Sequence, residues 1–294
     1  MVLYDQSGEE LAAALDSLAA SVAHAIRRGV AADAVLWLGD CSDRPCMDAA
    51  HLDSVREATG RAGIATVSYA HFGTNLGFGG GHNRLAEGAR EDVMLVLNPD
   101  TYCSPYVVEE LLSTLNDPSV GLVDAKQLPL EHPKSYDLST GDTSWALGAC
   151  FMMPTRIFRE IDGFDDRSFF LYCEDVDLSW RVKLAGFRVV HNPNAKFFHD
   201  KQLDDDGVFI PAAREPEESS ESALLLAYKF SRDDMVQKFL DHFDTSGLPF
   251  HARAAKRFRD RMASGDLPAR IDLDHRVGQF VGFDFAEHNF SYAD

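Results

Sequence analysis

The sequence predicts an α/β fold in which helices cover a mainly parallel central sheet, with a helical extension after it. Three observations carry this prediction. Short apolar runs without polar alternation are typical of strands covered on both faces, and segments with helix-spaced apolar residues lie between them. An acidic stretch with prolines then precedes a region whose pattern is helical only. We therefore divide the chain into a sheet domain, residues 1–203, and an acidic connection with a helical extension, residues 204–294.

The elements of the sheet domain follow in order. Ser7 and Glu10 form the pattern of a capping box. The apolar residues after them recur at steps of four and three, as in a helix packed on a sheet: Leu11, Leu15, Leu18, Val22 and Ile26. Four apolar runs predict strands: 34–38, 64–69, 93–98 and 120–125. Ser104 and Pro105 predict a helix over 105–116. In such an order, ligands bind at the carboxyl ends of the strands.

The acidic connection is expected to be solvated. Acidic residues and prolines crowd it: Asp204, Asp205, Asp206, Pro211, Glu215, Pro216, Glu217, Glu218 and Glu221. Helix-spaced apolar residues follow over 223–230, 234–243 and 250–262, whereas 265–294 shows no clear pattern.

Composition indicates a cytoplasmic enzyme rather than a nucleic-acid-binding or secreted protein. The formal net charge is −19, from 47 acidic and 28 basic residues, which argues against a phosphate-backbone partner. The five cysteines form no CxxC pair, and their odd number is no disulfide framework, so a reducing compartment is expected. Neither a signal peptide nor an apolar run of eighteen residues is present, so we do not expect membrane spanning.

A glycine cluster at 77–81 predicts a turn that opens a short helix near His82. It lacks the GKS ending of a P-loop, and His82 stands where a dinucleotide fingerprint has its third glycine. Free backbone amides at such a turn can meet a diphosphate. A plain tight turn is the alternative, and the cluster alone does not decide between them.

Asn98-Pro99-Asp100 follows a strongly apolar strand and delivers an amide oxygen and a carboxylate to the sheet edge. Oxygen ligands of this kind suit Mg²⁺ or Mn²⁺, which also bind substrate phosphates. The same tripeptide alone is also typical of an Asx turn that ends a strand.

Glu174, Asp175 and Asp177 open a helix that runs to Ala185, with Gly186 as its stop. Asp177 lies four residues before Arg181, which indicates a structural ion pair. Asp175 has no cation in reach along the helix, so it is the better candidate for a general base.

Together these segments resemble the family 2 glycosyltransferases of the GT-A fold, particularly the rhamnosyltransferase-like branch of bacteria. The resemblance covers about residues 1–200 and rests on four segments with their order and spacing: Leu3–Asp5, Asn75–Asn83, Leu97–Asp100, and Phe164–Asp165 with Phe169–Leu178 and Trp180–Arg181. It implies a three-layer α/β/α domain that binds a nucleotide sugar.

The resemblance also implies the roles of individual residues. Asp175 would be the base, and Asp100 with His199 would hold the divalent metal, Mn²⁺ or Mg²⁺, on the donor diphosphate. The donor site would comprise Tyr4, Asp5, Asp40, Asn75, Gly77, Gly79, Asn98 and Asp100. The sugar and acceptor cleft would comprise Trp145, Gly148, Ala149 and Glu174.

Two departures from the family pattern bear on these roles. Gly39-Asp40-Cys41-Ser42 stands where the family commonly has Asp-Asn-x-Ser, which puts the base of the nucleotide in doubt. Asn98 replaces the first acid of a strict D-x-D, which weakens the metal site without removing it.

The implied activity is a metal-dependent, inverting transfer of a sugar to a hydroxyl of a glycan or a lipid-linked acceptor. Rhamnose from a dTDP donor is the leading expectation, with galactofuranose or another hexose from UDP behind it. Two alternatives stay open: a nucleotidyltransferase or nucleotide-sugar hydrolase, and a non-catalytic carbohydrate or Ca²⁺-binding module that uses Asp204–Asp206 and Glu174–Asp177.

A basic cluster lies in the last predicted helix: Arg253, Lys256, Arg257, Arg259 and Arg261. A solvated helix face is one interpretation. Peripheral contact with anionic lipid at the inner face of the cell membrane is another, because basic amphipathic helices bind such surfaces. A role of the extension in homo-oligomer formation is equally open.

Overall fold

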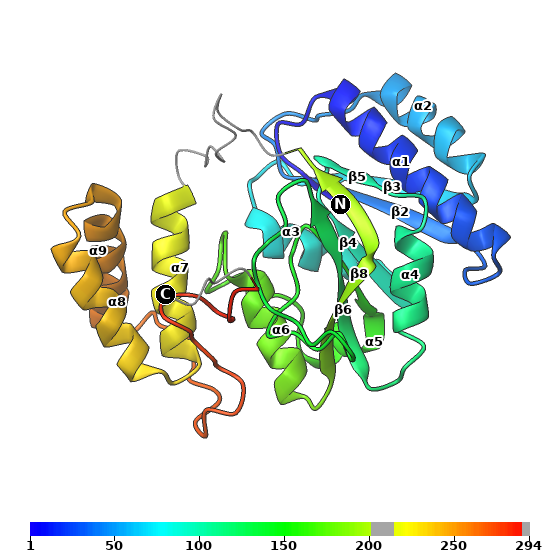
Figure 1. Cartoon of the computed structure of the whole chain (residues 1–294). Coiled ribbons are helices and arrows are strands. Elements are labelled where there is room, and N and C mark those ends of the chain that lie inside the picture. Colours follow the sequence, from blue (N-terminus) through cyan, green and yellow to red (C-terminus); the bar gives the residue numbers. More distant parts are fainter. Residues whose placement is uncertain (201–214, 290–294) are drawn as a thin grey trace.

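The computed structural model describes residues 1–200 and 215–289, which form an α/β domain followed by three helices (Figure 1). The strands are β1 (Val2–Leu3), β2 (Ala34–Asp40), β3 (Ile64–His71), β4 (Val93–Leu97), β5 (Thr101–Cys103), β6 (Val120–Leu128), β7 (Cys150–Pro154) and β8 (Arg188–His199). The helices are α1 (Gly8–Arg27), α2 (Ala49–Gly60), α3 (Gly77–Ala86), α4 (Val107–Thr114), α5 (Thr155–Glu160), α6 (Glu174–Leu184), α7 (Glu215–Lys229), α8 (Asp233–Thr245) and α9 (Pro249–Ser264).

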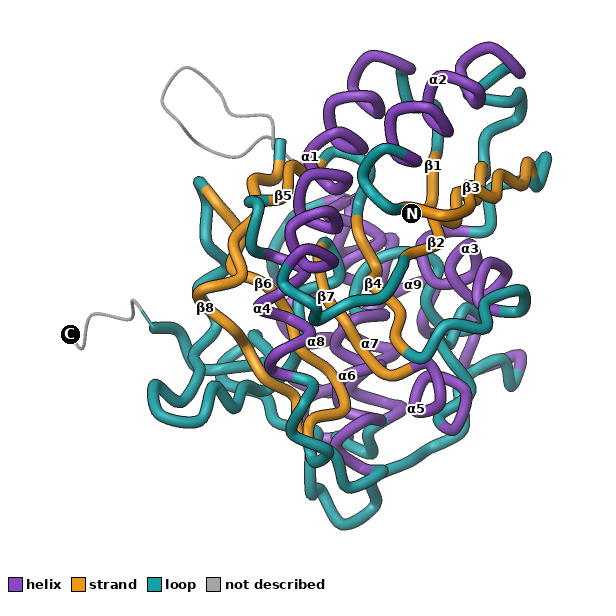
Figure 2. The backbone as a smooth tube through the Cα atoms, turned by 90° about the vertical axis from the view of Figure 1, so that its right-hand side faces the viewer, coloured by secondary structure: helices purple, strands orange, loops and turns teal. Residues whose placement is uncertain are grey.

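The strands form two sheets (Figure 2). One sheet, in the order β1-β2-β3, is entirely parallel. The other has the order β4-β7-β6-β8-β5, and there β6 and β8 are parallel, whereas β7 and β5 run antiparallel to their neighbours. The predicted α/β fold with parallel strands is confirmed, and β5 and β7 are additions that the sequence did not predict.

The apolar core lies in three parts that follow the layers. One part packs α1 and α4 against the sheets, and another packs α5 and α6 against the opposite face of β6 and β7. This arrangement is the expected α/β/α sandwich. The third part joins α6 to α7, α8 and α9, because the Trp180 ring contacts Phe230 with centroids 4.9 Å apart. The extension therefore shares a core with the sheet domain.

The predicted starts of α4 and α7 are wrong. α4 begins at Val107 rather than Pro105, and its N-cap, Tyr106, makes no side-chain capping bond, because the Val107 amide closes a tight turn onto the Ser104 carbonyl at 3.2 Å. α7 begins at Glu215, so the second half of the expected acidic connection is helical. Residues 201–214, including Asp204–Asp206, lie outside the described part of the chain. The side chain of Glu10, one of the two residues of the predicted capping box, also lies outside it.

The basic cluster of α9 is largely neutralised by carboxylates. Arg253 pairs with Glu217 and Arg257 with Glu218, both on α7, and Arg259 pairs with Asp244 at the end of α8. These pairs explain why an acidic segment is helical here: α7 packs its acids against α9. They favour the solvated, ion-paired interpretation of the cluster over lipid contact. Within the described residues, no helix is both long and apolar enough to cross a membrane.

Candidate active site

A cavity of about 840 Å³ lies between the carboxyl edge of the second sheet and the helical extension. Its floor comes from strand ends and the start of α6, and its far wall comes from α7, α8, α9 and residues 283–288. Seven of the predicted site residues line it: Asn98, Trp145, Gly148, Ala149, Glu174, Asp175 and His199. These residues are up to a hundred positions apart in sequence, so the fold gathers them into one site.

The glycine segment and the acidic segment meet at this cavity. The Phe78 amide donates to the Phe170 carbonyl at 3.3 Å, and Phe78 lines the cavity beside Gly148. A Cβ on Gly77 would lie 2.3 Å from the Phe170 carbonyl oxygen. The absence of a side chain at Gly77 therefore lets the two segments come together.

The glycines themselves are helical, which corrects the predicted turn. α3 begins at Gly77, five residues before His82, and the side-chain oxygen of Asn75 accepts from the Gly77 amide at 3.0 Å. Gly77 has φ +71°, a conformation that favours glycine. Gly79 is buried, and a Cβ there would lie 2.9 Å from Phe164. The glycines thus serve close packing of α3, and one predicted diphosphate donor, the Gly77 amide, already has a partner.

Asp100 and His199 are brought together by strand pairing, because His199 pairs with Thr101 in the β5–β8 ladder. The Nε2 atom of His199 lies 3.2 Å from Oδ2 of Asp100. On the other side of the ring, Nδ1 lies 2.7 Å from Oε1 of Gln127. The Gln127 amide nitrogen donates to the Leu130 carbonyl, which fixes Oε1 toward the histidine.

These contacts leave a site for a cation. Because Oε1 of Gln127 can only accept, Nδ1 of His199 carries the hydrogen, and the lone pair of a neutral ring points from Nε2 to the carboxylate. Oδ1 of Asp100 is buried without a hydrogen-bond partner. Nε2 of a neutral His199 and Oδ2 of Asp100 would both be acceptors that face each other, and Oδ1 of Asp100 lacks a partner. Such a set of atoms fits a divalent metal. No cluster of three such ligands occurs within the described residues, so substrate or Asn98 oxygens would complete the shell.

Asp175 lines the cavity at the start of α6. Its Oδ2 accepts from the Gly148 amide at 2.9 Å, and its Oδ1 accepts from the Val176 amide at 2.8 Å. Burial raises the pKa of this carboxyl, and the two amides offset part of that effect. A carboxylate held by two amides, with some solvent contact, can accept a proton from a bound hydroxyl.

Glu174 differs from Asp175, although they are adjacent. Its Oε2 is buried and unpartnered. Burial, and next the charge of Asp175, hold the pKa of the Glu174 carboxyl well above its usual range. Of the two, Asp175 gives up its proton first, and Glu174 keeps one.

Asp177 has the structural role that its spacing predicts. Its Oδ2 pairs with Nε of Arg181 at 2.7 Å. Its Oδ1 additionally pairs with Nζ of Lys229 at 2.5 Å, which ties α7 to α6. The sequence offers no local sign of the second pair, because the two residues are far apart.

Lys134 is a cavity residue that the sequence did not indicate. Nζ donates to Oδ2 of Asp124 at 2.6 Å and to the Trp145 carbonyl at 2.5 Å, and Asp124 also accepts from the Leu147 amide at 2.8 Å. This buried ion pair holds the segment that carries Gly148. A lone lysine in a loop carries no spacing signal, so only the fold reveals it.

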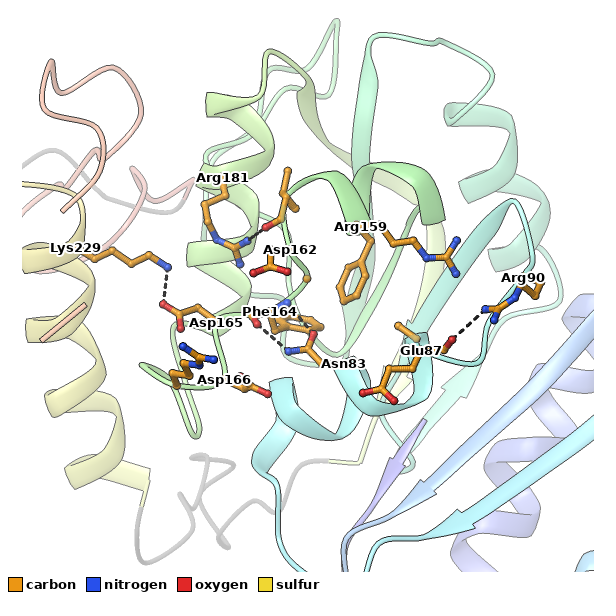
Figure 3. Close-up of a pocket in the computed structure, with 15 residues that line it drawn as sticks. Asn83, Glu87, Arg90, Arg159, Asp162, Phe164, Asp165, Asp166, Arg181 and Lys229 are labelled. Atoms are coloured by element: carbon orange, nitrogen blue, oxygen red, sulfur yellow. Dashed lines mark hydrogen bonds and ion pairs between the residues drawn. The ribbon is translucent and has the colours of Figure 1, made fainter. Parts of the chain in front are cut away.

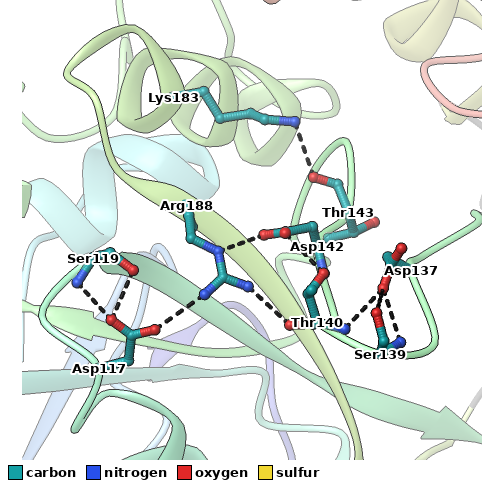
Figure 4. A network of polar contacts seen from close by, with 9 residues as sticks. All are labelled: Asp117, Ser119, Asp137, Ser139, Thr140, Asp142, Thr143, Lys183 and Arg188. Atoms are coloured by element: carbon teal, nitrogen blue, oxygen red, sulfur yellow. Dashed lines mark hydrogen bonds and ion pairs between the residues drawn. The ribbon is translucent and has the colours of Figure 1, made fainter.

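Arg188 holds the middle of the same segment, as Figure 4 shows. The guanidinium donates to Asp142 at 2.8 Å, to Asp117 at 3.0 Å and to the Thr140 carbonyl at 2.9 Å. Residues 134–148 are thus held near both ends by Asp124 and in the middle by Arg188, which positions the amide that contacts Asp175.

Three predicted nucleotide-binding residues lie at the strand ends of the first sheet, outside the cavity lining. Tyr4 is 55% exposed, and Asp5 is also exposed, both just after β1.

Asp40, the last residue of β2, is buried, and its carboxylate accepts from the amides of Ser42 at 2.9 Å and Cys46 at 2.7 Å. Burial opposes ionisation there, but hydrogen bonds from Tyr69, Cys46 and Ser42 outweigh it and lower the pKa of Asp40. Asp40 therefore holds the loop that follows β2.

A second pocket, of about 830 Å³, lies between α3, α5, α6 and α7 and contains none of the predicted site residues (Figure 3). Acidic and basic side chains alternate around it. Lys229 pairs there with Asp165 at 2.7 Å, and Arg181 donates to the Ile161 carbonyl at 2.6 Å. The Lys229–Asp165 pair links α7 of the extension to the segment before α6 at this pocket.

Sequence comparisons find rhamnosyltransferases among the relatives. No protein-family model matches the chain. An N-acetylglucosaminyl-diphospho-decaprenol L-rhamnosyltransferase of Mycobacterium tuberculosis is 27% identical over 176 residues, covering 44% of this chain and 57% of that protein. The rhamnosyltransferase WbbL of Escherichia coli K12 is 33% identical over 82 residues, covering 28% and 31%. The chain thus spans little more than half of the first relative and about a third of the second. Both relatives confirm the resemblance that its motifs predict.

Solved structures show the fold. GalNAc-T7, crystallised with UDP, GalNAc and Mn²⁺, matches with a TM-score of 0.57 at 11% identity, over 83% of this chain and 49% of that one. TarS of Staphylococcus aureus, residues 1–349 with UDP-GlcNAc, matches with a TM-score of 0.51 at 13% identity, over 90% and 72%. The chain therefore has the GT-A fold that the sequence predicts.

Proposed function

We propose that this GT-A chain, which is similar to family 2 rhamnosyltransferases, is a metal-dependent, inverting glycosyltransferase. The single observation that carries the proposal is the Asp175 carboxylate, held by the Gly148 amide at 2.9 Å in a cavity that also receives His199. Asp100 does not line this cavity, but its carboxylate lies 3.2 Å from the His199 ring that does. A proton acceptor with candidate metal ligands beside it is what sugar transfer from a nucleoside diphosphate requires.

Asp100 and His199 would hold the metal, with Asn98 beside them. Mn²⁺ or Mg²⁺ at this place would offset the charge that develops on the departing diphosphate. The unpartnered Oδ1 of Asp100 supports this assignment. The presence of Mn²⁺ with UDP in the GalNAc-T7 crystal supports a divalent metal for the fold.

Asp175 acts as the base. Its carboxylate takes the proton of an acceptor hydroxyl while the hydroxyl oxygen attacks the anomeric carbon of the donor. The new carbon–oxygen bond forms as the bond to the diphosphate oxygen breaks on the opposite face, so the anomeric configuration inverts. The nucleoside diphosphate leaves with the electron pair of the broken bond, and the proton stays on Asp175.

The names of the relatives support the proposed sugar and acceptor classes. Rhamnose carried by dTDP is the proposed donor, with a UDP sugar as the alternative. The name of the M. tuberculosis relative specifies a diphospho-decaprenol acceptor, which supports a glycan or lipid-linked acceptor here. We place the reaction in the cytoplasm or at the inner face of the cell membrane.

Turnover of Asp175→Asn tests the proposal. The wild-type protein with Mn²⁺, a panel of dTDP and UDP sugars and a mixed glycan acceptor should release nucleoside diphosphate, and the variant should do so about 10² to 10⁴ times more slowly. The matched control is Asp166→Asn, an exposed carboxylate outside this cavity. Undiminished turnover of Asp175→Asn contradicts the assignment, and release of pyrophosphate or of free sugar identifies a nucleotidyltransferase or a hydrolase.

A further inference from the structure

The helical extension forms a large part of the active-site cavity. Phe239, His242 and Phe243 of α8, His251 of α9 and residues 283–286 line the side opposite the strand ends. This wall is fixed to the catalytic half, because the Ser222 hydroxyl donates to the Leu171 carbonyl at 2.9 Å and the Ser144 hydroxyl donates to the Phe285 carbonyl at 2.6 Å. The wall is therefore part of the site that faces Asp175.

An exposed aromatic platform stands on this wall. The Phe283 ring is 40% exposed, although large apolar rings usually lie buried. The His242 ring lies beside it, with centroids 4.8 Å apart and planes 38° apart, and the Phe239 ring supports it at 5.3 Å. Nζ of Lys238 lies 4.7 Å from the centre of the Phe283 ring. The ring is held in place, so a ligand can stack on it at little entropic cost.

Polar groups surround the platform. The carboxylate of Asp284 lies 3.4 Å from Nε2 of His288, and both residues line the cavity. The ring of His251 stacks on Phe243 at 4.3 Å, and its Nδ1 lies 2.8 Å from the Ser246 hydroxyl. Aromatic faces and hydrogen-bonding groups thus alternate along one wall.

This alternation distinguishes a sugar ring from an alkyl chain. A pyranose has an apolar C–H face that an aromatic ring can cover, and hydroxyls at its edge that meet polar side chains. An alkyl chain at the same place would remove Asp284 and His242 from water without replacing their hydrogen bonds, which is unfavourable. The chemistry of the wall therefore favours a carbohydrate.

We propose that Phe283 and His242 form a stacking platform for a sugar residue of the acceptor, so that the helical extension selects a carbohydrate rather than a lipid chain at this place. The inference rests on the proposed function, because an acceptor occupies the cavity only if Asp175 is the base for its hydroxyl. It gives the extension a role in substrate choice.

Saturation-transfer NMR on the whole chain, with Mn²⁺ and UDP present, tests the platform. The probes are methyl glycosides of glucose, galactose, mannose, rhamnose and N-acetylglucosamine, with decyl phosphate as the lipid comparison. At least one glycoside should receive saturation from the wild-type protein. Phe283→Ala should bind it about three- to tenfold more weakly, and Phe283→Tyr should restore binding. Val281→Ala is the matched control, because Val281 is 44% exposed in the same segment and does not line the cavity.

Each outcome has one meaning. The platform is overturned if none of the glycosides receives saturation from the wild-type protein. It is also overturned if Phe283→Ala transfers saturation to them as well as the wild type does. Transfer to decyl phosphate that depends on Phe283, without transfer to glycosides, also overturns it in favour of a lipid chain. Nucleotide binding is measured separately by thermal shift. A wild-type protein that binds no nucleoside diphosphate contradicts the proposed function itself, whereas nucleotide binding without glycoside binding overturns the platform alone.

Discussion

His199 faces Asp100 across 3.2 Å, while Gln127 holds the opposite nitrogen of the ring at 2.7 Å. The histidine is therefore oriented before any ligand arrives. The three residues come from three places in the sheet. Asp100 lies just before β5, Gln127 is on β6, and His199 is at the end of β8. The pairing of Asp100 with His199 is therefore a product of the sheet rather than of a long loop.

The orientation of His199 leads to a prediction about Gln127. Gln127→Leu removes the acceptor for the Nδ1 hydrogen, so the ring loses the contact that directs Nε2 to the metal position. We expect Mn²⁺ affinity in the presence of UDP to fall about 10- to 100-fold, measured by isothermal calorimetry. Gln237→Leu on the surface of α8 is the control. Equal affinity in both variants would remove Gln127 from the metal site.

The raised pKa of Asp175 predicts the acid limb of the pH–rate profile. The base must be ionised, so activity should fall as the pH drops through the pKa of this carboxyl, which burial raises from the ordinary value of an aspartate. Because Glu174 keeps its proton, Glu174→Gln should leave the position of this limb unchanged. Initial rates of nucleoside diphosphate release between pH 4 and 8 provide the measurement. A limb that moves with Glu174→Gln would assign the titration to Glu174.

Glu174 also predicts how stability depends on pH. Folding raises the pKa of the Glu174 carboxyl. Its contribution to the stability of the fold is therefore complete below the pKa that Glu174 has in the unfolded chain, and is lost as the pH rises toward the pKa that it has in the folded chain. Glu174→Gln removes this loss. We expect the variant to gain stability relative to the wild type between pH 5 and pH 8, measured by urea unfolding at both values. A constant difference between the two proteins would mean that Glu174 ionises without cost.

Lys229 should be essential for the attachment of the extension. Its ammonium pairs with Asp165 at 2.7 Å and Asp177 at 2.5 Å and is largely buried. Lys229→Met therefore leaves Asp165 without this cation and leaves Asp177 with Arg181 alone. We expect a loss of about 3 kcal/mol in the free energy of unfolding. Lys256→Met, which breaks an exposed pair with Asp260, should cost less than about 1 kcal/mol. Similar losses in the two variants would contradict this difference.

The sequence predicted the parts of the fold that local patterns encode. Apolar runs located β2, β3, β4 and β6, and the spacing of Asp177 and Arg181 predicted their ion pair. The strand β7 was not predicted, although residues 150–154 form a short apolar run directly after Gly148 and Ala149, which the resemblance assigned to the sugar cleft. The start of α3 was misplaced, because glycines are poor helix formers in isolation and here are helical for close packing.

The candidate site was predictable where neighbouring residues form a motif. Asn98 and Asp100, and Glu174 and Asp175, are such pairs, and the fold brings both to one region. Lys134, Gln127 and the aromatic wall of the extension were not predictable. Each acts through partners distant in sequence, and such contacts leave no local spacing. Contact with the nucleotide stays a prediction for five residues: Tyr4, Asp5, Asp40, Asn75 and Gly79.

Nucleotide binding by the wild type and by Asp100→Ala is the most direct test of the proposed function. Thermal unfolding is followed with uridine, thymidine, guanosine or cytidine diphosphate, each with Mn²⁺, Mg²⁺ or a chelator. Ligand at a hundred times its Kd should add about 2.7 kcal/mol of stability. We predict a metal-dependent rise in Tm with the thymidine or uridine nucleotide that is lost in Asp100→Ala. A folded wild-type protein whose Tm no nucleotide changes would contradict the glycosyltransferase proposal.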